Sequence, residues 1–397
     1  MENFVGLLIR RERLEKNYSQ EGLCRGICAV SYLSKIEQGK AQAGDDVVVP
    51  LLARLGIDFE TDPEFLAWGE ALVVSLYEKL LTGREEDCRQ KLEELAEKKE
   101  RLLRSPYMLD ALLLEGLDNE EDHLPELLDR LEPFAGAMDR RQYPLYLLWR
   151  LAVGRDRDAE PLLRLAAGTY YTVSAGNIYL RRGRYTEAAV LLQRGYDRAA
   201  EEGRPYLMLL ARLLLGNCYS AIGHRRLMEE SYQIARRLGE ELGQTELLAS
   251  IDYNIAATYL EWGMDREALA ILETAPWEDL WYWHKLAIAL ERAGRMAEAR
   301  EALARAYADQ KERGRDTTVE KILDLVAYRL DNKDYVKQEA YAVMVREVCT
   351  QAEKELGEGY ARFHLPFLLE ALEAQRQYKE AYQLMKEFSY KDRIIGD

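Results

Sequence analysis

Hydrophobic residues recur at helical spacing along most of the chain, and near its start they mark three short segments. The first covers residues 4–17. The second follows Ser19, whose hydroxyl is placed to cap a helix N-terminus. The third covers residues 31–39 and ends at Gly39, which suits a left-handed C-terminal cap. Two short helices joined by a tight turn predict a helix-turn-helix motif, which a closing helix over residues 47–55 completes.

Beyond residue 60 the helical period continues without a strand-like alternation. A capping residue before Pro63 predicts a helix start, because the missing amide of proline costs nothing at the first helical position. Four later prolines each precede an apolar-periodic segment of roughly fifteen residues, so we expect successive helices with short connectors to about residue 170. These prolines are Pro106, Pro125, Pro144 and Pro161.

A repeat appears in the second half of the chain. Tyr179, Tyr219 and Tyr259 lie 40 residues apart, and each is followed four residues later by a glycine. The small and large residues around them resemble the tetratricopeptide pattern, which continues through a fourth unit and returns in a last unit that includes Met385. In the second unit Met228 stands where a small residue is expected, so we expect that helix pair to sit more openly.

These patterns predict an all-α protein with two parts. Residues 1–60 form an N-terminal helix-turn-helix domain, and residues 61–397 form a tetratricopeptide-like helical-repeat superhelix. The clearest repeats cover residues 170–310.

The composition and charge favour a folded, soluble protein. Hydrophobic residues make up 48% and charged residues 31% of the 397 residues, with only 10 prolines. The net charge of −15 argues against non-specific coating of nucleic acid, yet the first forty residues carry a net charge of +2. Five scattered cysteines and no apolar run of membrane-spanning length predict a cytoplasmic protein with reduced thiols.

Motifs of catalysis are missing from the sequence. It contains no phosphate-binding glycine loop, no G-x-S-x-G elbow and no HExxH motif, and its four histidines are far apart in sequence. The acidic run 118–122 lacks the alternating spacing of a calcium-binding loop and is expected to be a solvated loop. We therefore expect no catalytic residues, no metal, no cofactor and no enzymatic activity.

The N-terminal segment resembles the phage-repressor-like, or xenobiotic response element, helix-turn-helix family. The matching residues are Arg13, Ser19-Gln20, Leu23 and Ser34-Lys35-Ile36-Glu37-Gln38-Gly39. The turn Gly26-Ile27-Cys28 is one residue shorter than in most such repressors and is similar to that of the Gram-positive peptide-pheromone receptor regulators. This resemblance implies a tetratricopeptide array behind the domain and an ion pair between Arg13 and Glu37.

Candidate DNA-binding residues follow from the geometry of the motif. The N-terminal part of its second helix enters the major groove, so its exposed side chains are expected at base edges. These are Val30, Ser31, Tyr32 and Lys35. The resemblance implies that three further side chains contact the DNA backbone, with Arg10 and Arg11 as weaker candidates. The three are Gln20, Gln38 and Lys40.

Candidate ligand-binding residues are expected on the concave face of the array, which the first helix of each repeat lines. Asn177, Asn217, Asn254 and Lys285 occupy these positions in successive repeats. A primary amide offers donors and an acceptor and can hold an extended peptide backbone. The order Asn217, Asn254, Lys285 is similar to the carboxylate clamp of peptide-binding tetratricopeptide domains, although exposed asparagines that are merely solvated would show the same pattern. Possible side-chain contacts are Arg212, Tyr253, Trp281 and His284.

The sequence therefore predicts a homodimeric transcription regulator of the quorum-sensing type. Its expected partners are a double-stranded DNA operator and a short signalling peptide, and the peptide would change operator affinity. Two alternatives use the same groove: a protein-interaction adaptor, and a phage lysis–lysogeny peptide receptor.

Overall fold

The computed structural model describes residues 4–83, 86–117, 123–165, 168–275, 279–314 and 316–393. The acidic run 118–122 lies outside these ranges. The described residues form helices and turns without a strand, which confirms the all-α fold. The chain divides into two compact units, Met1–Ala175 and Gly176–Asp397.

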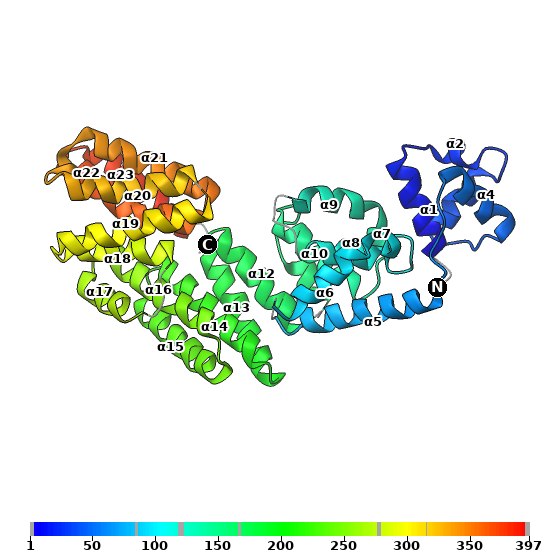
Figure 1. Ribbon diagram of the computed structural model, residues 1–397, viewed down its shortest axis with the longest axis horizontal. Helices are drawn as coiled ribbons and strands as arrows, with labels where there is room; N and C mark the ends of the chain where they lie inside the picture. The colour runs from blue at the N-terminus through cyan, green and yellow to red at the C-terminus, as the bar shows by residue number, and fades with distance from the viewer. Residues whose placement is uncertain are drawn as a thin grey trace. The chain divides into compact units, whose positions relative to one another are not determined.

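Four helices form the N-terminal domain (Figure 1). The Oγ of Ser19 accepts a hydrogen bond from the Gly22 N–H at 2.9 Å, and Gly39 adopts a φ of +67°, so both predicted caps are confirmed. Helix α1 crosses the C-terminal turn of α3 closely, since a Cβ on Gly6 would lie 2.0 Å from the Ile36 carbonyl oxygen. The helices are α1 (Phe4–Glu15), α2 (Gln20–Cys24), α3 (Val30–Glu37) and α4 (Asp45–Leu55).

The predicted ion pair between Arg13 and Glu37 is confirmed. Arg13 donates from Nε and Nη2 to the two carboxylate oxygens of Glu37 at 2.6 and 2.9 Å, and from Nη1 to the Tyr18 carbonyl at 3.1 Å. A bidentate guanidinium–carboxylate pair fixes geometry as well as charge. It therefore holds α1 against α3 and sets the angle of the recognition helix.

The rest of the first unit consists of shorter helices than the sequence pattern predicts. Asp62 caps α5 by accepting from the Glu64 N–H at 3.0 Å, with Pro63 at the first helical position as expected. The segments after the other prolines are 5 to 11 residues long, not fifteen. Turns interrupt them, as at Gly154 with a φ of +83°. The elements are α5 (Pro63–Leu80), α6 (Glu86–Glu97), α7 (Lys99–Leu102), α8 (Met108–Glu115), α9 (Leu124–Leu131), η2 (Glu132–Ala137), α10 (Gln142–Ala152) and α11 (Glu160–Arg164).

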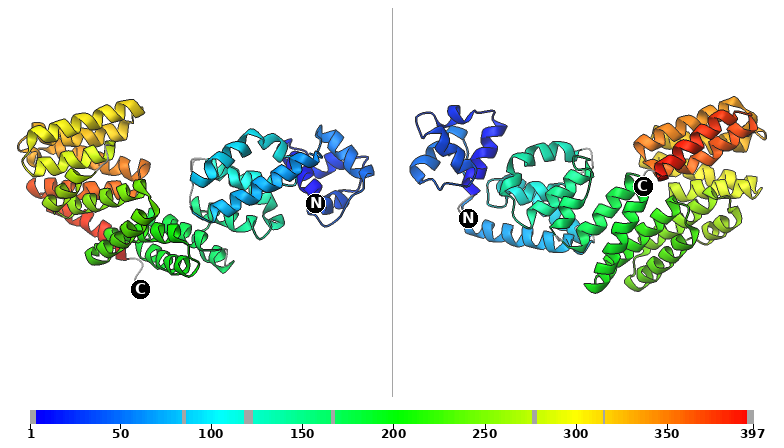
Figure 2. Two further views of the ribbon diagram at one scale, coloured as in Figure 1. Left: turned by 60° about the horizontal axis from the view of Figure 1, so that its bottom comes forward. Right: turned by 180° about the vertical axis from the view of Figure 1, so that it is seen from behind.

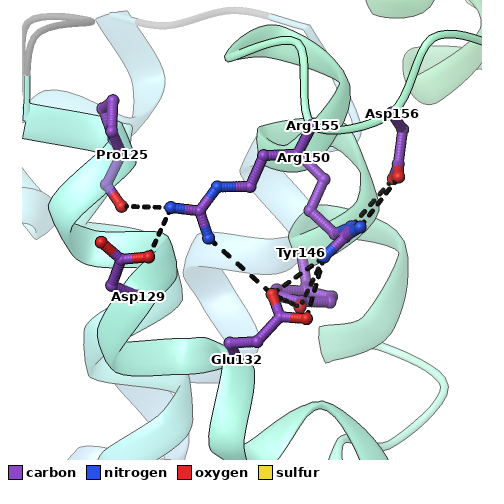
Figure 3. A network of polar contacts seen from close by, with 7 residues as sticks. All are labelled: Pro125, Asp129, Glu132, Tyr146, Arg150, Arg155 and Asp156. Carbon is purple, nitrogen blue, oxygen red and sulfur yellow. Dashed lines mark hydrogen bonds and ion pairs between the residues drawn. The ribbon is translucent and has the colours of Figure 1, made fainter.

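Charged side chains join these short helices (Figure 3). Arg150 donates to Glu132 at 2.8 Å and to Asp156 at 3.0 Å, which links α10 to η2 and to the turn that follows α10. Arg155 donates to the Pro125 carbonyl at 2.9 Å and to Asp129 at 2.6 Å, both on α9. The network therefore links α9, η2 and α10 through charged side chains.

The N-terminal domain contacts the helices behind it. Arg11 is buried and donates to the Leu103 carbonyl just after α7, and Arg10 lies over the Phe134 ring of η2 at 5.5 Å. On the same side, Arg101 donates to Glu60 at 2.7 Å. The prediction that Arg11 reaches DNA is wrong, because its buried guanidinium donates to the Leu103 carbonyl.

Six helix pairs form the second unit (Figures 1 and 2), although α12 begins before its boundary. The turns inside the first three pairs contain Gly183, Gly223 and Gly263 with φ of +72°, +74° and +72°, which explains the glycine that follows each repeat tyrosine. The fifth pair was not predicted. The pairs are α12 (Thr169–Arg181) with α13 (Tyr185–Glu201), α14 (Pro205–Ala221) with α15 (Arg225–Leu242), α16 (Thr245–Glu261) with α17 (Asp265–Thr274), α18 (Leu280–Arg292) with α19 (Met296–Arg313), α20 (Thr317–Asp331) with α21 (Glu339–Glu355), and α22 (Glu358–Ala374) with α23 (Tyr378–Arg393).

One packing expectation for the repeats is wrong. The second pair is closely packed. The Tyr232 ring lies so close to Gly216 that a Cβ added at this glycine would be 2.3 Å from the ring carbon Cε1. Met228 is fully buried. Met385 is 53% exposed, since no described helix follows α23 to cover that face.

The last pair returns toward the middle of the array. Helix α22 contacts α16 as well as its own partner, and its residues Tyr360 and Phe363 lie over α18. The inner faces of α16, α18 and α22 therefore converge.

None of the described helices combines the length and the apolar composition that a bilayer crossing needs.

Candidate functional site: the inner face of the repeats and the recognition helix

The structure brings two of the predicted asparagines together on the inner face. Asn254 on α16 donates from Nδ2 to the Oδ1 of Asn217 on α14 at 3.1 Å, and the Tyr232 hydroxyl donates to the same Oδ1 at 2.7 Å. Both asparagines are half-buried. Within the described residues no hydrogen bond joins the Asn217 Nδ2 or the Asn254 Oδ1 to another group, so the pair keeps one donor and one acceptor.

Lys285 and His284 lie deeper than the sequence suggested. We expected them on an open groove, but they are 2% and 0% exposed. The Lys285 Nζ lies 3.4 Å from the His284 Nδ1 and 3.2 Å from the centroid of the Phe363 ring. Phe363 belongs to α22, so the return of the last repeat covers these two residues. Burial lowers the pKa of Lys285 well below its ordinary value, and the charge of Glu261 acts against this shift.

The remaining predicted residues divide into two groups. Trp281 and Tyr253 are half-buried beside Lys285: the Trp281 ring lies 4.8 Å from the Tyr360 ring, and the Lys285 Nζ lies 5.9 Å from the Tyr253 ring. Arg212 instead stacks on Tyr196 at 3.9 Å. Asn177, half-buried on α12, is not joined to the asparagine pair by any contact in the described part of the chain.

The sequence analysis did not predict that side chains of α22 lie beside α16 and α18. The Arg362 Nε lies 3.4 Å from the Glu261 Oε1, and its guanidinium lies 5.8 Å from the Tyr185 ring of α13. The buried His364 pairs its Nδ1 with the Tyr360 carbonyl at 2.8 Å, and burial, followed by the charge of Lys285, lowers the pKa of His364 to about 3. The last repeat unit was visible in the sequence, but its return to α16 depends on packing between distant repeats.

The recognition helix α3 presents several predicted residues to solvent. Val30 is 42% exposed, and Ser31 and Lys35 are also exposed on the first two turns. Leu33 and Ile36 point into the core of the domain. An exposed N-terminal face on a helix that is fixed from behind is the geometry by which this motif enters a major groove.

Other side chains that were predicted to contact DNA form hydrogen bonds within the domain. The Gln20 Nε2 donates to Glu37 at 2.8 Å, so this amide supports the Arg13–Glu37 pair. The Tyr32 hydroxyl donates to the Gln42 carbonyl at 3.1 Å, and Gln38 donates to the Ser34 Oγ at 3.1 Å while accepting from the Lys40 Nζ at 2.8 Å. The last two contacts are exposed, which leaves Gln38 and Lys40 accessible.

Comparison with known proteins identifies this first domain. Residues 9–61 match the helix-turn-helix family. The N-terminal domain is a helix-turn-helix DNA-binding domain. No curated protein matches the chain. Among solved structures, Bacillus thuringiensis PlcR in complex with the peptide PapR7 and DNA is similar at 13% sequence identity and a TM-score of 0.31, over 78% of this chain and 95% of that chain.

The helix-turn-helix domain contains one supporting residue that the sequence did not suggest. Arg54 on α4 donates from Nη1 to the Leu23 and Arg25 carbonyls at 2.6 and 2.8 Å, which satisfies the C-terminal end of α2. A basic side chain is commonly found at a helix C-terminus, but only the fold places α4 there.

Within the described residues, no three His, Cys, Asp or Glu side chains gather as metal ligands would.

Proposed function

We propose that this chain is a transcription regulator whose repeat unit binds a short, extended peptide and thereby changes the DNA affinity of its helix-turn-helix domain. The observation that carries the proposal is the paired amides of Asn217 and Asn254 on the inner face of the repeats. The donor and the acceptor that remain on the pair match the carbonyl and N–H of a peptide backbone, and do not require a particular side chain.

The amide pair favours a peptide over a folded protein as the ligand. Both asparagines are half-buried, and aromatic and charged side chains of α18 and α22 lie further in. An extended chain can reach such a converging face, whereas a folded partner needs a broad exposed surface. Peptide binding would shift operator affinity to the extent that the peptide prefers one conformation of the protein.

We further propose that the regulator acts in the cytoplasm and as a homodimer. Two copies of the motif can read two half-sites of one operator.

Calorimetry on the full chain tests this proposal. The titrants are synthetic peptides from the small secreted open reading frames of the source genome, and the variant is Asn217→Ala combined with Asn254→Ala. We expect the wild type to bind a peptide and the variant to bind it at least tenfold more weakly, because two backbone hydrogen bonds are lost.

Gln193→Ala is the matched control, since it removes an amide from α13, the second helix of a pair. Within the described residues this amide donates to Asp197 at 2.8 Å. Equal peptide affinity in the wild type and in the double variant would refute the assignment. Capture of a folded protein in place of any peptide would favour the adaptor function.

A further inference from the structure

The exposed face of α3 combines an apolar side chain with a cation. Val30 begins the helix and is exposed, and Lys35, just over one turn later, is exposed as well. Within the described residues, neither an ion pair nor a hydrogen bond joins the Lys35 ammonium to another group. Leu33 and Ile36 are buried on the opposite side and hold the helix in the domain. The helix therefore offers solvent a branched apolar surface and a hydrogen-bond donor.

The groups that recognise adenine and cytosine are bonded within the domain. Adenine is read by the amide of Asn or Gln, and cytosine by a carboxylate. Helix α3 contains one carboxylate, that of Glu37, which is buried and accepts from two side chains of the domain. It contains no primary amide, and the amide of Gln38 just behind it donates to Ser34 and accepts from Lys40. The face therefore lacks a free group that would select adenine or cytosine.

The two hydroxyls of the first turn do not decide which base is read. The Ser31 hydroxyl both donates and accepts, so its chemistry suits the edge of any base. The Tyr32 hydroxyl gives its one proton to the Gln42 carbonyl at 3.1 Å. The choice of base then depends on Val30 and Lys35. An apolar side chain contacts the methyl group of thymine, and a lysine ammonium donates to the O6 and N7 acceptors of guanine.

We propose that α3 reads a thymine methyl with Val30 and a guanine with Lys35. This inference rests on the proposed regulator function and specifies the class of DNA sequence in its operator. From Val30 to Lys35 the helix rises by about 7.5 Å, which corresponds to about two base-pair steps of ~3.4 Å. We therefore expect the half-site to contain an A·T pair and a G·C pair about two steps apart.

Base analogues in the DNA test each contact by removing a single group. The full chain first selects its site from random duplexes. Deoxyuridine then replaces each thymine of that site in turn, which removes the methyl group, and 7-deazaguanine replaces each guanine, which removes the N7 acceptor. We expect the wild type to bind about fourfold more weakly with deoxyuridine at one position, because one buried methyl group is lost. We expect a loss of about tenfold with 7-deazaguanine at a guanine about two pairs away.

Side-chain variants assign these losses to residues. Val30→Ala should lose most of the difference between thymine and deoxyuridine, and Lys35→Met should bind the guanine and 7-deazaguanine duplexes alike. Val49→Ala on α4 and Lys40→Met are the matched controls, because both residues are exposed in the same domain but lie outside α3. Both should keep the wild-type response to the analogues. Each result is a ratio of two affinities of one variant, so a change in its folded fraction cancels.

The outcomes separate this inference from the function on which it rests. If no deoxyuridine or 7-deazaguanine weakens wild-type binding to a selected site, the base assignment is overturned and the DNA-binding regulator stands. Unchanged analogue effects in Val30→Ala and Lys35→Met would also overturn it, because other side chains would then read these bases. If the full chain enriches no sequence from the random duplexes, both the base assignment and the proposed regulator are refuted.

Discussion

Ser31 and Lys40 are both exposed in the helix-turn-helix domain, and the sequence motif predicts different DNA contacts for them. Ser31 lies on the first turn of α3, where this motif is expected to meet base edges. Lys40 lies after the helix, beside Gln38, and is expected to contact the DNA backbone through its charge. The motif did not reveal that Gln20 and Tyr32, from the same segment, donate to Glu37 and Gln42, because such bonds depend on the folded positions of other elements.

Ser31→Ala should therefore lower affinity for a DNA site selected by the wild-type chain from random duplexes, by about 1 to 3 kcal/mol, with little change in non-specific binding. Lys40→Ala is the comparison, and should weaken binding to both kinds of DNA alike and reduce the salt dependence. Fluorescence anisotropy at matched salt measures both. Equal losses for Ser31→Ala on selected and random DNA would show that Ser31 touches only the backbone.

Asp110 on α8 is a buried carboxylate whose titration affects stability. It accepts from Arg141 at 3.2 Å and from Gln142 at 3.0 Å, yet burial, as the largest effect, raises its pKa from 3.8 to about 6. The folded state then binds more protons than the unfolded state between pH 4 and 6, so this group lowers the free energy of unfolding as pH rises through that window.

Asp110→Asn removes this titration. The free energy of unfolding of the variant minus that of the wild type should rise by about 2 kcal/mol from pH 4 to pH 7, at ~1.4 kcal/mol per pKa unit with part of the shift already present at pH 4. Urea unfolding of both full chains at the two pH values measures the difference. A difference that does not change with pH would mean that Asp110 titrates normally.

Lys285 provides a second test of burial at the residue scale. Within the described residues Lys285 forms no ion pair, so replacing this buried amine by an apolar side chain of similar length should stabilise the protein by about 1 to 3 kcal/mol at pH 7. The folded pKa is lowered, so the unfolded state binds the extra proton and the gain from Lys285→Met should shrink as pH rises toward 10. Denaturant unfolding at pH 7 and 9.5 measures this gain. Destabilisation at pH 7 would show that Lys285 is a paired cation.

At the scale of elements, the sequence predicted those helix starts, caps and turns that depend on neighbouring residues in the chain. The caps of α2 and α3, the start of α5 and the glycine turns after Tyr179, Tyr219 and Tyr259 were all expected. The pair α20–α21 was not predicted from the sequence. The convergence of α22 on α16 and α18 was also missed, since contacts between distant repeats leave no periodic signal in one sequence.

The close pairing of α14 and α15 gives a prediction at this scale. Gly216→Ala forces a methyl group against the Tyr232 ring and should destabilise the repeat unit by about 1 to 3 kcal/mol. It should also weaken peptide binding, because Tyr232 donates to Asn217. Gly359→Ala on α22, which has no heavy atom within 4 Å of the added carbon, is the control and should be neutral or stabilising. Thermal unfolding distinguishes the variants, and an equally stable Gly216→Ala would contradict the packing argument.

On the scale of the whole molecule, one chain joins a DNA-binding domain to a repeat array with a polar inner face. The helix-turn-helix domain is joined to the helices that follow it through Arg11 and Arg101, and the amide pair lies in the second unit. The sequence predicted the helix-turn-helix domain from its motif and the helical repeats from their spacing. It could not show that the last repeat covers part of the array, because that contact buries residues, such as Lys285, that look exposed in a repeat pattern.

The central claim is that the repeat unit controls DNA binding through a peptide. The most direct measurement is the affinity of the full chain for its selected DNA site, with and without the peptide that it binds best. We expect at least a tenfold change for the wild type and none for Asn217→Ala combined with Asn254→Ala. The same DNA affinity with and without saturating peptide in the wild type would contradict the account.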